Sequence, residues 1–457
     1  MSSHEIFITN PITISVKSFY PRNYTPNFLM VKDGMKGKPT IADYIKGGIN
    51  GGSTPPAFLF CNEGEGVPFI KTSAITRHYI NINDLQSINE AFHRKNIKRS
   101  ITLPYDVIYT MTGKFMGKAA MCPLTISEMN MSQNSVVFHT NSKEEAAFLT
   151  IYLNSEINRI QVGGTYSITK QKFMNQSKIA GLRVFPYTPK YDYLMKQYLN
   201  AFDMYYKSVE EIKNLIALFN MDYHLAFSDT AQYGFTVKPN AFEQRMLVPN
   251  FYRNDVSATI SSVLQKNEFS LLDKDRLSKG DEVGSANYTE EGTPFIKTSD
   301  IINFDVDYEP DCYCPDYFIN QLGQNIKKGD IIFAKDGKPG EVAIIEEDNK
   351  VVISSGLVKY HPQSNEERFW VFLLLTSKYG EAYFKKWFVI ASTMLHLRND
   401  FFNDFKIPQI TPEIREKYIV PLGTLFERKC ESYKMVKKVK TKVEKSFTDS
   451  TVDLTEI

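Results

Sequence analysis

The sequence lacks the features that mark membrane and secreted proteins. No apolar run approaches the length of a membrane span, and the opening residues MSSHEIFITN do not follow a signal-peptide pattern. The few cysteines form no even disulfide framework; they are Cys61, Cys122, Cys312, Cys314 and Cys430. We therefore expect a protein of the reducing cytoplasm with no membrane partner.

Metal-site and enzyme motifs are also missing. Cys312 and Cys314 resemble half a metal site, but no histidine or second cysteine pair follows nearby, and a structural zinc site needs four ligands. The sequence contains no Walker A lysine, no His-Glu-x-x-His, no Gly-x-Ser-x-Gly and no glycine-rich loop for a methyl donor. It therefore predicts a chain with no metal, no cofactor and no catalytic residues of its own.

What the sequence does contain is a repeat. PFIKTSAI at Pro68–Ile75 returns as PFIKTSDI at Pro294–Ile301, with seven of eight residues identical and an offset of 226 positions. Downstream, LPYDVIYTMTGKFMGKAAM (103–121) resembles KKGDIIFAKDGKPGEVAII (327–345). Since 457 residues suffice for two or three domains, we interpret this as a duplicated domain of roughly 200 residues, too long a period for a solenoid.

The two copies differ in charge, although the whole chain has a net charge of only +2. Residues 68–122 contain eight Lys or Arg and three Asp or Glu, whereas residues 294–346 contain five Lys and ten Asp or Glu. A shared framework with divergent surfaces is expected when the shared residues determine the fold and the surface residues of each copy recognise a different target. The acidic second segment weakens a simple phosphate-binding role there.

The element pattern is typical of an α+β fold. Short β-rich runs such as VPFIKTSAI, YDVIYTM and SVVFHT are separated by glycine and proline. One helix is predicted from Ser142 to Ile160, with an N-cap serine and a 3–4 spaced apolar face, and its counterpart is predicted over 365–387. No alternating strand–helix pattern appears.

Each copy ends in a long helical pattern. The first, over 190–219, has apolar residues at steps of three and four that form a coiled-coil seam. The second covers 413–447, where Lys429 and Ser432 interrupt the seam and Pro421 and Gly423 are predicted to break or restart the helix. Neither helix has a local partner, so we expect the two to pair with each other in antiparallel orientation.

These patterns predict five segments. They are a first β-rich domain at 1–188, a long helix at 189–221, a second β-rich domain at 222–411, a second long helix at 412–447 and a flexible tail at 448–457.

The repeated PFIKTS phrase is the first candidate site. It resembles the end of a phosphate-binding loop, but isoleucine replaces the glycine before the lysine, so we predict a strand with buried Phe and Ile. The polar turn that follows is either a plain turn or a DNA phosphate contact; its residues are Lys71, Thr72, Ser73, Lys297, Thr298 and Ser299.

Two further pairs of segments are candidates for DNA contact. TGKFMGK and DGKPGE are Gly-Lys turns, which are either simple hairpin turns or turns that present lysines to DNA. GGTYSITKQKF and ASTMLHLRNDF mix hydroxyl and basic residues, which either pack on the core or contact phosphates and base edges. The candidate residues are Lys114, Lys118, Thr165, Ser167, Lys170, Lys172, Lys335, Lys338, Ser392, Thr393, His396 and Arg398.

As a set, these segments resemble the specificity subunit of type I restriction–modification systems. The resemblance covers about 14–447 and rests on GGSTPP…GVPFIKTSAI, YTEEGTPFIKTSDI, KGDIIFAKDGKPGEVAII and the closing segments GGTYSITKQKF and ASTMLHLRNDFFNDFKIP. It implies two target recognition domains, each reading one half of a gapped double-stranded DNA target. It also implies that the helices act as spacers.

The same resemblance implies partners. Such helices bind modification subunits, here expected to be two, which carry S-adenosylmethionine and methylate adenine; a restriction subunit with motor and nuclease activity is a further partner. Two other functions stay open at this point. One is a stand-alone DNA methyltransferase or nuclease with its own recognition domains, and the other is a protein scaffold that does not bind DNA.

Overall fold

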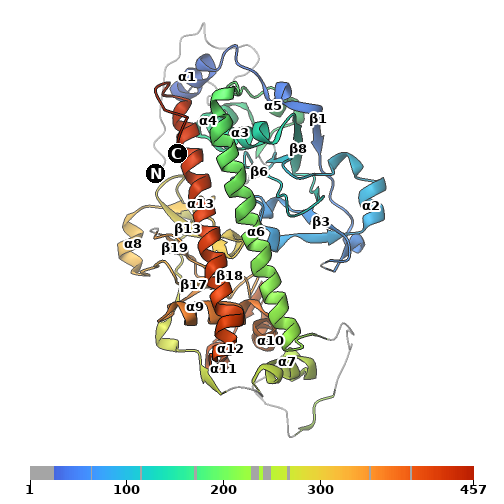
Figure 1. Ribbon diagram of the computed structural model, residues 1–457, viewed down its shortest axis with the longest axis vertical. Helices are drawn as coiled ribbons and strands as arrows, with labels where there is room; N and C mark the ends of the chain where they lie inside the picture. The colour runs from blue at the N-terminus through green and yellow to red at the C-terminus, as the bar shows by residue number, and fades with distance from the viewer. Residues whose placement is uncertain are drawn as a thin grey trace. The chain divides into compact units, whose positions relative to one another are not determined.

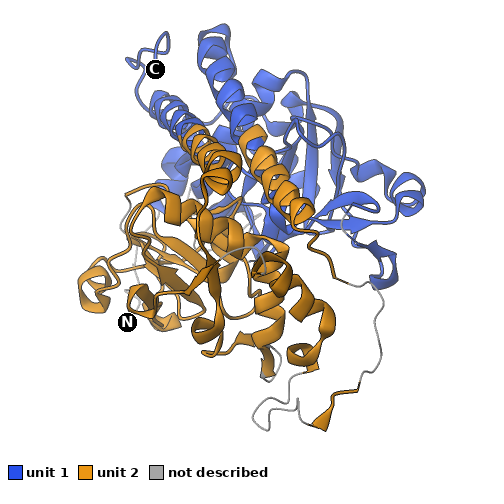
Figure 2. Ribbon diagram, turned by 60° about the horizontal axis from the view of Figure 1, so that its bottom comes forward, with its two compact units in different colours: residues 1–206, 431–457 blue, residues 207–430 orange. Residues whose placement is uncertain are grey.

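The computed structural model describes residues 25–62, 64–113, 116–168, 172–227, 236–239, 249–264, 268–348, 351–391 and 394–457. The chain divides into two compact units (Figure 2). Unit 1 is Met1–Tyr206 with Glu431–Ile457, and unit 2 is Lys207–Cys430. Both divisions fall inside long helices, α6 (Asp192–Asp222) and α13 (Val420–Ser446), so each unit contains a stretch of both helices.

Each unit contains a four-stranded antiparallel sheet with the same strand order. In unit 1 the order is β1-β8-β5-β6, formed by Ile45–Gly51, Ser135–Thr140, Val107–Thr110 and Ala119–Met121. In unit 2 it is β12-β20-β17-β18, formed by Leu277–Lys279, Leu357–Tyr360, Ile331–Ala334 and Val342–Ile344 (Figure 1). All residues of β5 and β17 are buried, which accounts for their continuous apolar sequence. The domain duplication predicted from the sequence is therefore present in the fold.

A second small sheet also recurs. In unit 1, β3 (Val67–Ile70) pairs in parallel with β7 (Asn130–Met131). In unit 2, β13 (Thr293–Ile296) pairs in parallel with β19 (Val352–Ile353). Phe69, Ile70, Phe295 and Ile296 are all fully buried, which confirms the strand predicted from the repeated phrase.

The other strands are short. They are β2 (Phe60–Cys61), β4 (Gln86–Ile88), β9 (Ser167–Ile168), β10 (Lys172–Phe173), β11 (Phe269–Leu271), β14 (Ile301–Ile302), β15 (Asp305–Val306), β16 (Tyr313–Cys314), β21 (Phe388–Ala391), β22 (Met394–Leu397) and β23 (Lys406–Pro408). Shorter helices complete the units: α1 (Pro26–Gly34), α2 (Glu90–Lys95), α5 (Gln176–Ala180), α7 (Asn254–Leu264), α8 (Tyr317–Leu322) and α11 (Phe401–Asp404).

One glycine in each copy is required by a close backbone approach. A Cβ added to Gly52 would lie 2.2 Å from the carbonyl oxygen of Ser132, and one added to Gly280 would lie 2.1 Å from that of Ser354. No side chain fits at either distance. The two units therefore share this backbone packing as well as their strand order.

The helix predicted after the sheet is in fact two helices in each unit. Unit 1 has α3 (Lys143–Asn154) and α4 (Glu156–Thr165), and unit 2 has α9 (Asn365–Thr376) and α10 (Lys378–Trp387). Ser155 and Ser377 interrupt the helices with extended backbone. Each serine hydroxyl donates to a carbonyl three residues earlier, at 2.6 Å and 2.9 Å, and so closes the preceding helix.

The predicted N-cap of the first of these helices is confirmed. The hydroxyl of Ser142 accepts a hydrogen bond from the backbone N–H of Glu145 at 3.1 Å. Ser364 caps α9 in the same way, accepting from Glu367 N–H at 3.1 Å. The same capping serine therefore starts the corresponding helix in both copies.

Pro421 does not end the second long helix, contrary to the expectation of a break. Helix α12 (Pro412–Ile414) continues through a π-helical turn over Arg415–Ile419 into α13. A proline ring collides with the carbonyl four residues earlier, here that of Lys417, and a wider π turn accommodates this. The irregularity therefore lies before Pro421, and the chain stays helical through Gly423.

The two long helices run antiparallel, as expected. In unit 1, the hydroxyls of Tyr191, just before α6, and Ser446, at the end of α13, lie 3.1 Å apart. In unit 2, Arg428 Nε donates to Ser208 Oγ at 2.9 Å. Figures 1 and 2 both show the helices side by side.

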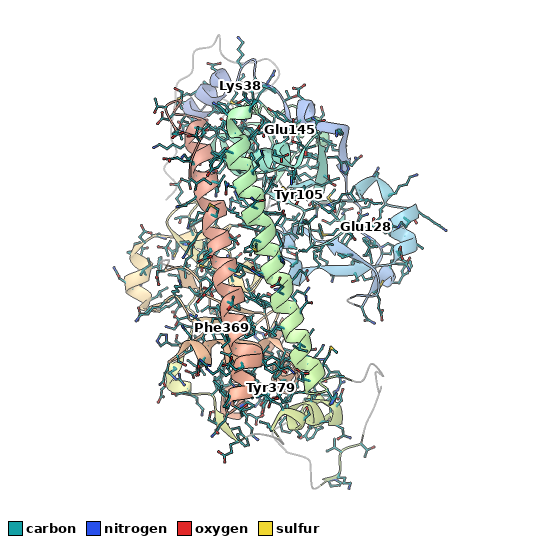
Figure 3. All side chains as sticks on the ribbon, in the orientation of Figure 1. Lys38, Tyr105, Glu128, Glu145, Phe369 and Tyr379 are labelled. Atoms are coloured by element: carbon teal, nitrogen blue, oxygen red, sulfur yellow. The ribbon has the colours of Figure 1, made fainter. Side chains whose placement is uncertain are left out.

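Aromatic side chains attach the helices to the globular part of each unit. Phe447 stacks on Phe185 in unit 1, with ring centroids 4.9 Å apart. Tyr105 lies beside α6 and donates a hydrogen bond to Asp203 Oδ2 at 2.8 Å (Figure 3). Phe369 of α9 packs on Phe426 of α13 in unit 2, at 5.6 Å (Figure 3). The helices are thus integral to the cores.

Candidate nucleic-acid interface

In unit 2, the Gly-Lys turn predicted from the sequence meets the β21–β22 hairpin. The Gly-Lys turn follows β17, and its Gly337 N–H donates to the carbonyl of Leu395 in β22 at 3.0 Å. Leu397 N–H donates back to the carbonyl of Lys335 at 2.8 Å. The hairpin is therefore fastened to this turn by backbone hydrogen bonds.

The Lys-Thr-Ser turn after β13 lies next to the Gly-Lys turn that follows β17. A Cβ at Gly337 would stand 3.9 Å from Thr298 Oγ1, and one at Gly356 would stand 3.3 Å from the Thr298 methyl carbon. Three segments that are far apart in the sequence thus form one surface, which we call the unit 2 reading surface: residues 297–299, 335–338 and 394–398.

A hydrogen-bonded triad of Lys335, Asp336 and His396 lies at the centre of the unit 2 reading surface. The Lys335 ammonium forms an ion pair with Asp336 Oδ2, and Asp336 Oδ1 lies 2.8 Å from His396 Nδ1. The side chains of Lys335, Asp336 and His396 are 13%, 20% and 34% exposed. One carboxylate therefore holds both a lysine and a histidine in fixed positions at the edge of solvent.

Unit 1 repeats the backbone contacts with different side chains. Gly113 N–H donates to the carbonyl of Lys172 at 2.8 Å, and Met174 N–H donates to that of Met111 at 3.0 Å. The bridged residues here are Thr112 and Phe173. The unit 1 reading surface therefore consists of residues 111–113 and 172–174, and its bridged positions, Thr112 and Phe173, have no charge.

An Asp–His pair marks the start of the central strand in both units. Asp106 Oδ1 lies 2.9 Å from His139 Nδ1 in unit 1, and Asp330 Oδ1 lies 2.6 Å from His361 Nδ1 in unit 2. The other oxygen of each aspartate accepts from a backbone N–H three residues earlier. The hydrogen bond that His139 donates to the Asp106 carboxylate raises the pKa of His139. Both pairs hold the turn that precedes β5 or β17.

Five of the predicted DNA-contacting residues have exposed or half-exposed side chains. Lys71, Ser73, Lys172 and Ser299 are exposed, and the Lys338 side chain is 50% exposed. Thr72 is half-buried and shares a hydrogen bond of 3.2 Å with Ser132. These positions agree with a surface role.

Lys297 differs from its repeat equivalent Lys71. Its Nζ lies 3.1 Å from Cys312 Sγ and 4.0 Å from the centroid of the Tyr288 ring. Burial opposes its charge, but the hydrogen bond to Cys312 and the neighbouring Tyr288 outweigh burial and raise the pKa of Lys297. The lysine is thus packed against an aromatic ring rather than extended into solvent.

The prediction of an exposed lysine is wrong for Lys118. This residue is only 6% exposed, because it follows the turn and enters β6 beside Thr110, whose hydroxyl accepts from its backbone N–H. A turn motif in the sequence does not reveal which end of it points inward.

Three other predicted residues have intramolecular partners. Thr165 is the last residue of α4 and donates to the Gln161 carbonyl at 2.6 Å. Ser167 accepts from Lys178 Nζ at 2.8 Å, and Arg398 Nε donates to Asp400 at 2.8 Å. Lys114, Lys170, Ser392 and Thr393 lie outside the described residues.

The sequence interpretation missed Asp336, which organises the unit 2 reading surface. It lies within the DGK turn, where the sequence pattern favoured only the lysines as contact residues. Aligning DGKPG with TGKFM would have singled it out, because threonine replaces it in the first copy.

No group of three or more His, Cys, Asp or Glu residues in the described part of the chain is arranged to hold a metal ion. None of the described helices combines the length and apolarity needed to cross a bilayer.

Comparison with known families finds a similarity within unit 2. Residues 263–416 match the family model of the type I restriction modification DNA specificity domain. The match includes all three segments of the unit 2 reading surface, and it confirms the resemblance noted in the sequence for the second copy. Comparison with the curated proteins finds no match.

Comparison with solved structures finds low-identity matches that cover most of the chain. One is the crystal structure of the type-I restriction-modification system S subunit from M. genitalium, with 14% identity, TM-score 0.30, and 92% of this chain and 96% of that chain covered. Another is the HsdS subunit from Thermoanaerobacter tengcongensis, with 13% identity, TM-score 0.27, and 91% and 96% covered. A third concerns complex assembly of the type I R-M system, with 15% identity, TM-score 0.26, and 88% and 98% covered.

Proposed function

We propose that this chain is the DNA sequence-recognition subunit of a type I restriction–modification complex. The observation that carries this proposal is the specificity domain over residues 263–416. Its strand order and its turn-to-hairpin hydrogen bonds recur in unit 1. Each unit then reads one half of a two-part double-stranded DNA target.

The divergent side chains on the two reading surfaces support an asymmetric target. Phosphate contacts position a protein on DNA, and contacts to base edges specify the sequence. Unit 1 offers Thr112 and Phe173 where unit 2 offers Asp336 and His396. Identical frameworks with different side chains would read different half-sites.

The long helices supply docking sites for modification subunits in this proposal. Large apolar side chains remain exposed on α6 and α13: Tyr193, Met204, Leu218, Met221 and Val420. Exposed apolar groups on otherwise polar helices fit protein partners. Two modification subunits would bring S-adenosylmethionine and methylate adenine, and a restriction subunit with motor and nuclease activity would join the same cytoplasmic complex. The recognition chain itself is non-catalytic.

Methylome sequencing of cells that carry this chain with a type I modification subunit tests the proposal. A methylated, gapped, asymmetric motif is expected, and it should disappear when this chain is deleted. The purified chain alone should neither bind radiolabelled S-adenosylmethionine nor cleave or methylate DNA. Activity of the chain alone would favour a stand-alone enzyme, and a complex that retains no DNA at low salt would favour a scaffold.

A further inference from the structure

The ring of His396 has a fixed orientation on the unit 2 reading surface. We propose that His396 is a base-reading residue whose Nε2 accepts a hydrogen bond from the exocyclic amino group of an adenine or a cytosine in the major groove. This inference rests on the proposed function and assigns a specificity-determining residue within it.

The carboxylate of Asp336 sets the tautomer of the histidine. An ionised carboxylate only accepts hydrogen bonds, so the neutral imidazole next to it carries its proton on Nδ1, which lies 2.8 Å from Asp336 Oδ1. The other ring nitrogen, Nε2, then presents a lone pair and acts as an acceptor. Lys335 holds the second oxygen of Asp336, so the carboxylate cannot rotate away without breaking an ion pair.

The backbone holds the histidine in place as well. Asp336 and His396 form an antiparallel bridge, and the hydrogen bonds of Gly337 and Leu397 flank it on either side. The side chain of His396 is 34% exposed. No described residue forms a hydrogen bond with its Nε2. An acceptor atom is thus fixed at the surface by the Asp336 carboxylate, by the ion pair of that carboxylate with Lys335, and by the backbone bridge between Asp336 and β22.

An acceptor discriminates among bases in the major groove. Adenine N6 and cytosine N4 are the amino donors there, whereas guanine N7 and O6 and thymine O4 are acceptors that repel a lone pair. A fixed acceptor therefore selects adenine or cytosine on the strand it faces. The equivalent position in unit 1 is Phe173, which has no acceptor, so the unit 1 half-site does not share this preference.

Two substitutions in the assembled complex test the inference. His396→Phe places the unit 1 side chain in unit 2 and removes the acceptor. His396→Gln retains an acceptor oxygen at similar reach. We expect the wild-type motif to contain adenine or cytosine at one position of one half-site. His396→Phe should relax discrimination there by about tenfold or more, while the other half-site and the gap stay unchanged.

His396→Gln should keep the preference for the amino base, which a purely structural role for the ring would not require. Asp336→Asn provides an independent measurement, because an amide that donates to Nδ1 leaves the proton on Nε2 and shifts the preference toward guanine or thymine. The readout is the methylated motif in cells that carry each variant.

Each outcome decides the inference. An unchanged motif with His396→Phe overturns it while leaving the proposed function intact, whereas a wild-type complex with no gapped motif overturns the proposed function itself. If the His396→Phe complex methylates no site, its affinity is measured for duplexes substituted at each motif position. Loss of discrimination at one position alone supports the inference, and an equal loss at all positions overturns it.

Discussion

The ammonium group of Lys429 in α13 lies 3.5 Å from the carboxylate of Asp305 in β15, and the two side chains are 1% and 8% exposed. Lys429 interrupts the apolar seam expected for the helix, and this buried ion pair accounts for the interruption. Asp305 also accepts a hydrogen bond from Tyr308 at 3.0 Å. The pair links α13 to the globular part of unit 2.

Removing one member of this pair should destabilise unit 2 strongly. Lys429→Met leaves the Asp305 carboxylate buried without its partner, and we expect a loss of about 3–5 kcal/mol in the free energy of unfolding. Lys434→Met, an exposed lysine on the same helix, is the matched control and should change stability by less than about 0.5 kcal/mol. Urea denaturation of both variants provides the comparison. Equal midpoints for both would show that the buried pair contributes nothing.

Glu346 should make stability depend on pH. Burial raises the pKa of Glu346 to about 7, above its ordinary value of 4.5, so the folded state binds a proton more tightly than the unfolded state. Its contribution to stability is therefore fully present below about pH 4.5 and is lost as the pH rises through about 7. For a pKa shift of this size, the free energy of unfolding falls by about 3 kcal/mol over this pH range.

Glu346→Gln tests this sign, because glutamine mimics the protonated acid at every pH. The variant should be more stable than the wild type at pH 8.5, and the two should converge at pH 5. Thermal unfolding at both values measures the difference. Glu290→Gln, at an exposed glutamate, is the control and should follow the wild-type curve. If Glu346→Gln differed in stability from the wild type by the same amount at both pH values, the prediction would be contradicted.

Lys338 should contribute to DNA affinity without contributing to folding. Its side chain is half-exposed, and its ion pair with Glu341 spans 3.4 Å at the surface, where such pairs are worth little. Lys338→Ala should weaken binding to DNA by the assembled complex and lower the slope of log affinity against log salt by about one.

Lys328 provides the matched control for this measurement. It is exposed at the opposite end of β17, away from the unit 2 reading surface. Lys328→Ala should leave the salt slope unchanged in the same titration. If both variants lose affinity equally, the lysines act through general charge rather than through this surface.

The paired helices should set the gap between half-sites. The contacts of Tyr191 with Ser446 and of Ser208 with Arg428 place Asn200 opposite Val436. Four residues inserted after each of these positions add about 6 Å, close to two base pairs, and keep the apolar faces nearly in phase. We expect methylome sequencing to show a longer gap and unchanged half-sites.

Two-residue insertions at the same positions are the control. In each helix they rotate the part after the insertion by about 200° relative to the part before it. They should therefore disrupt the packing rather than lengthen the gap. A four-residue variant that modifies the original motif with the original gap would show that the helices do not set the spacing.

Local patterns in the sequence determined much of this architecture. Two nearly identical phrases predicted the duplication, and Phe69 and Phe295 are buried in strands as their apolar neighbours indicated. The N-cap at Ser142 and the seam of α6 also follow from local pattern, because capping and helical periodicity depend on residues within one or two turns.

Tertiary structure alone decided which of the candidate side chains reach solvent. Lys71 and Lys297 occupy the same place in identical PFIKTS phrases, yet Lys71 is exposed, whereas Lys297 lies 4.0 Å from the ring centroid of Tyr288 and 3.1 Å from Cys312 Sγ. Asp336 and His396 are 60 residues apart and meet through strand pairing that no local pattern encodes. The sequence by itself determined the repeated framework, since strands and helices follow from short-range periodicity. The chemistry of each reading surface depends on long-range contacts, and these exist only in the folded unit.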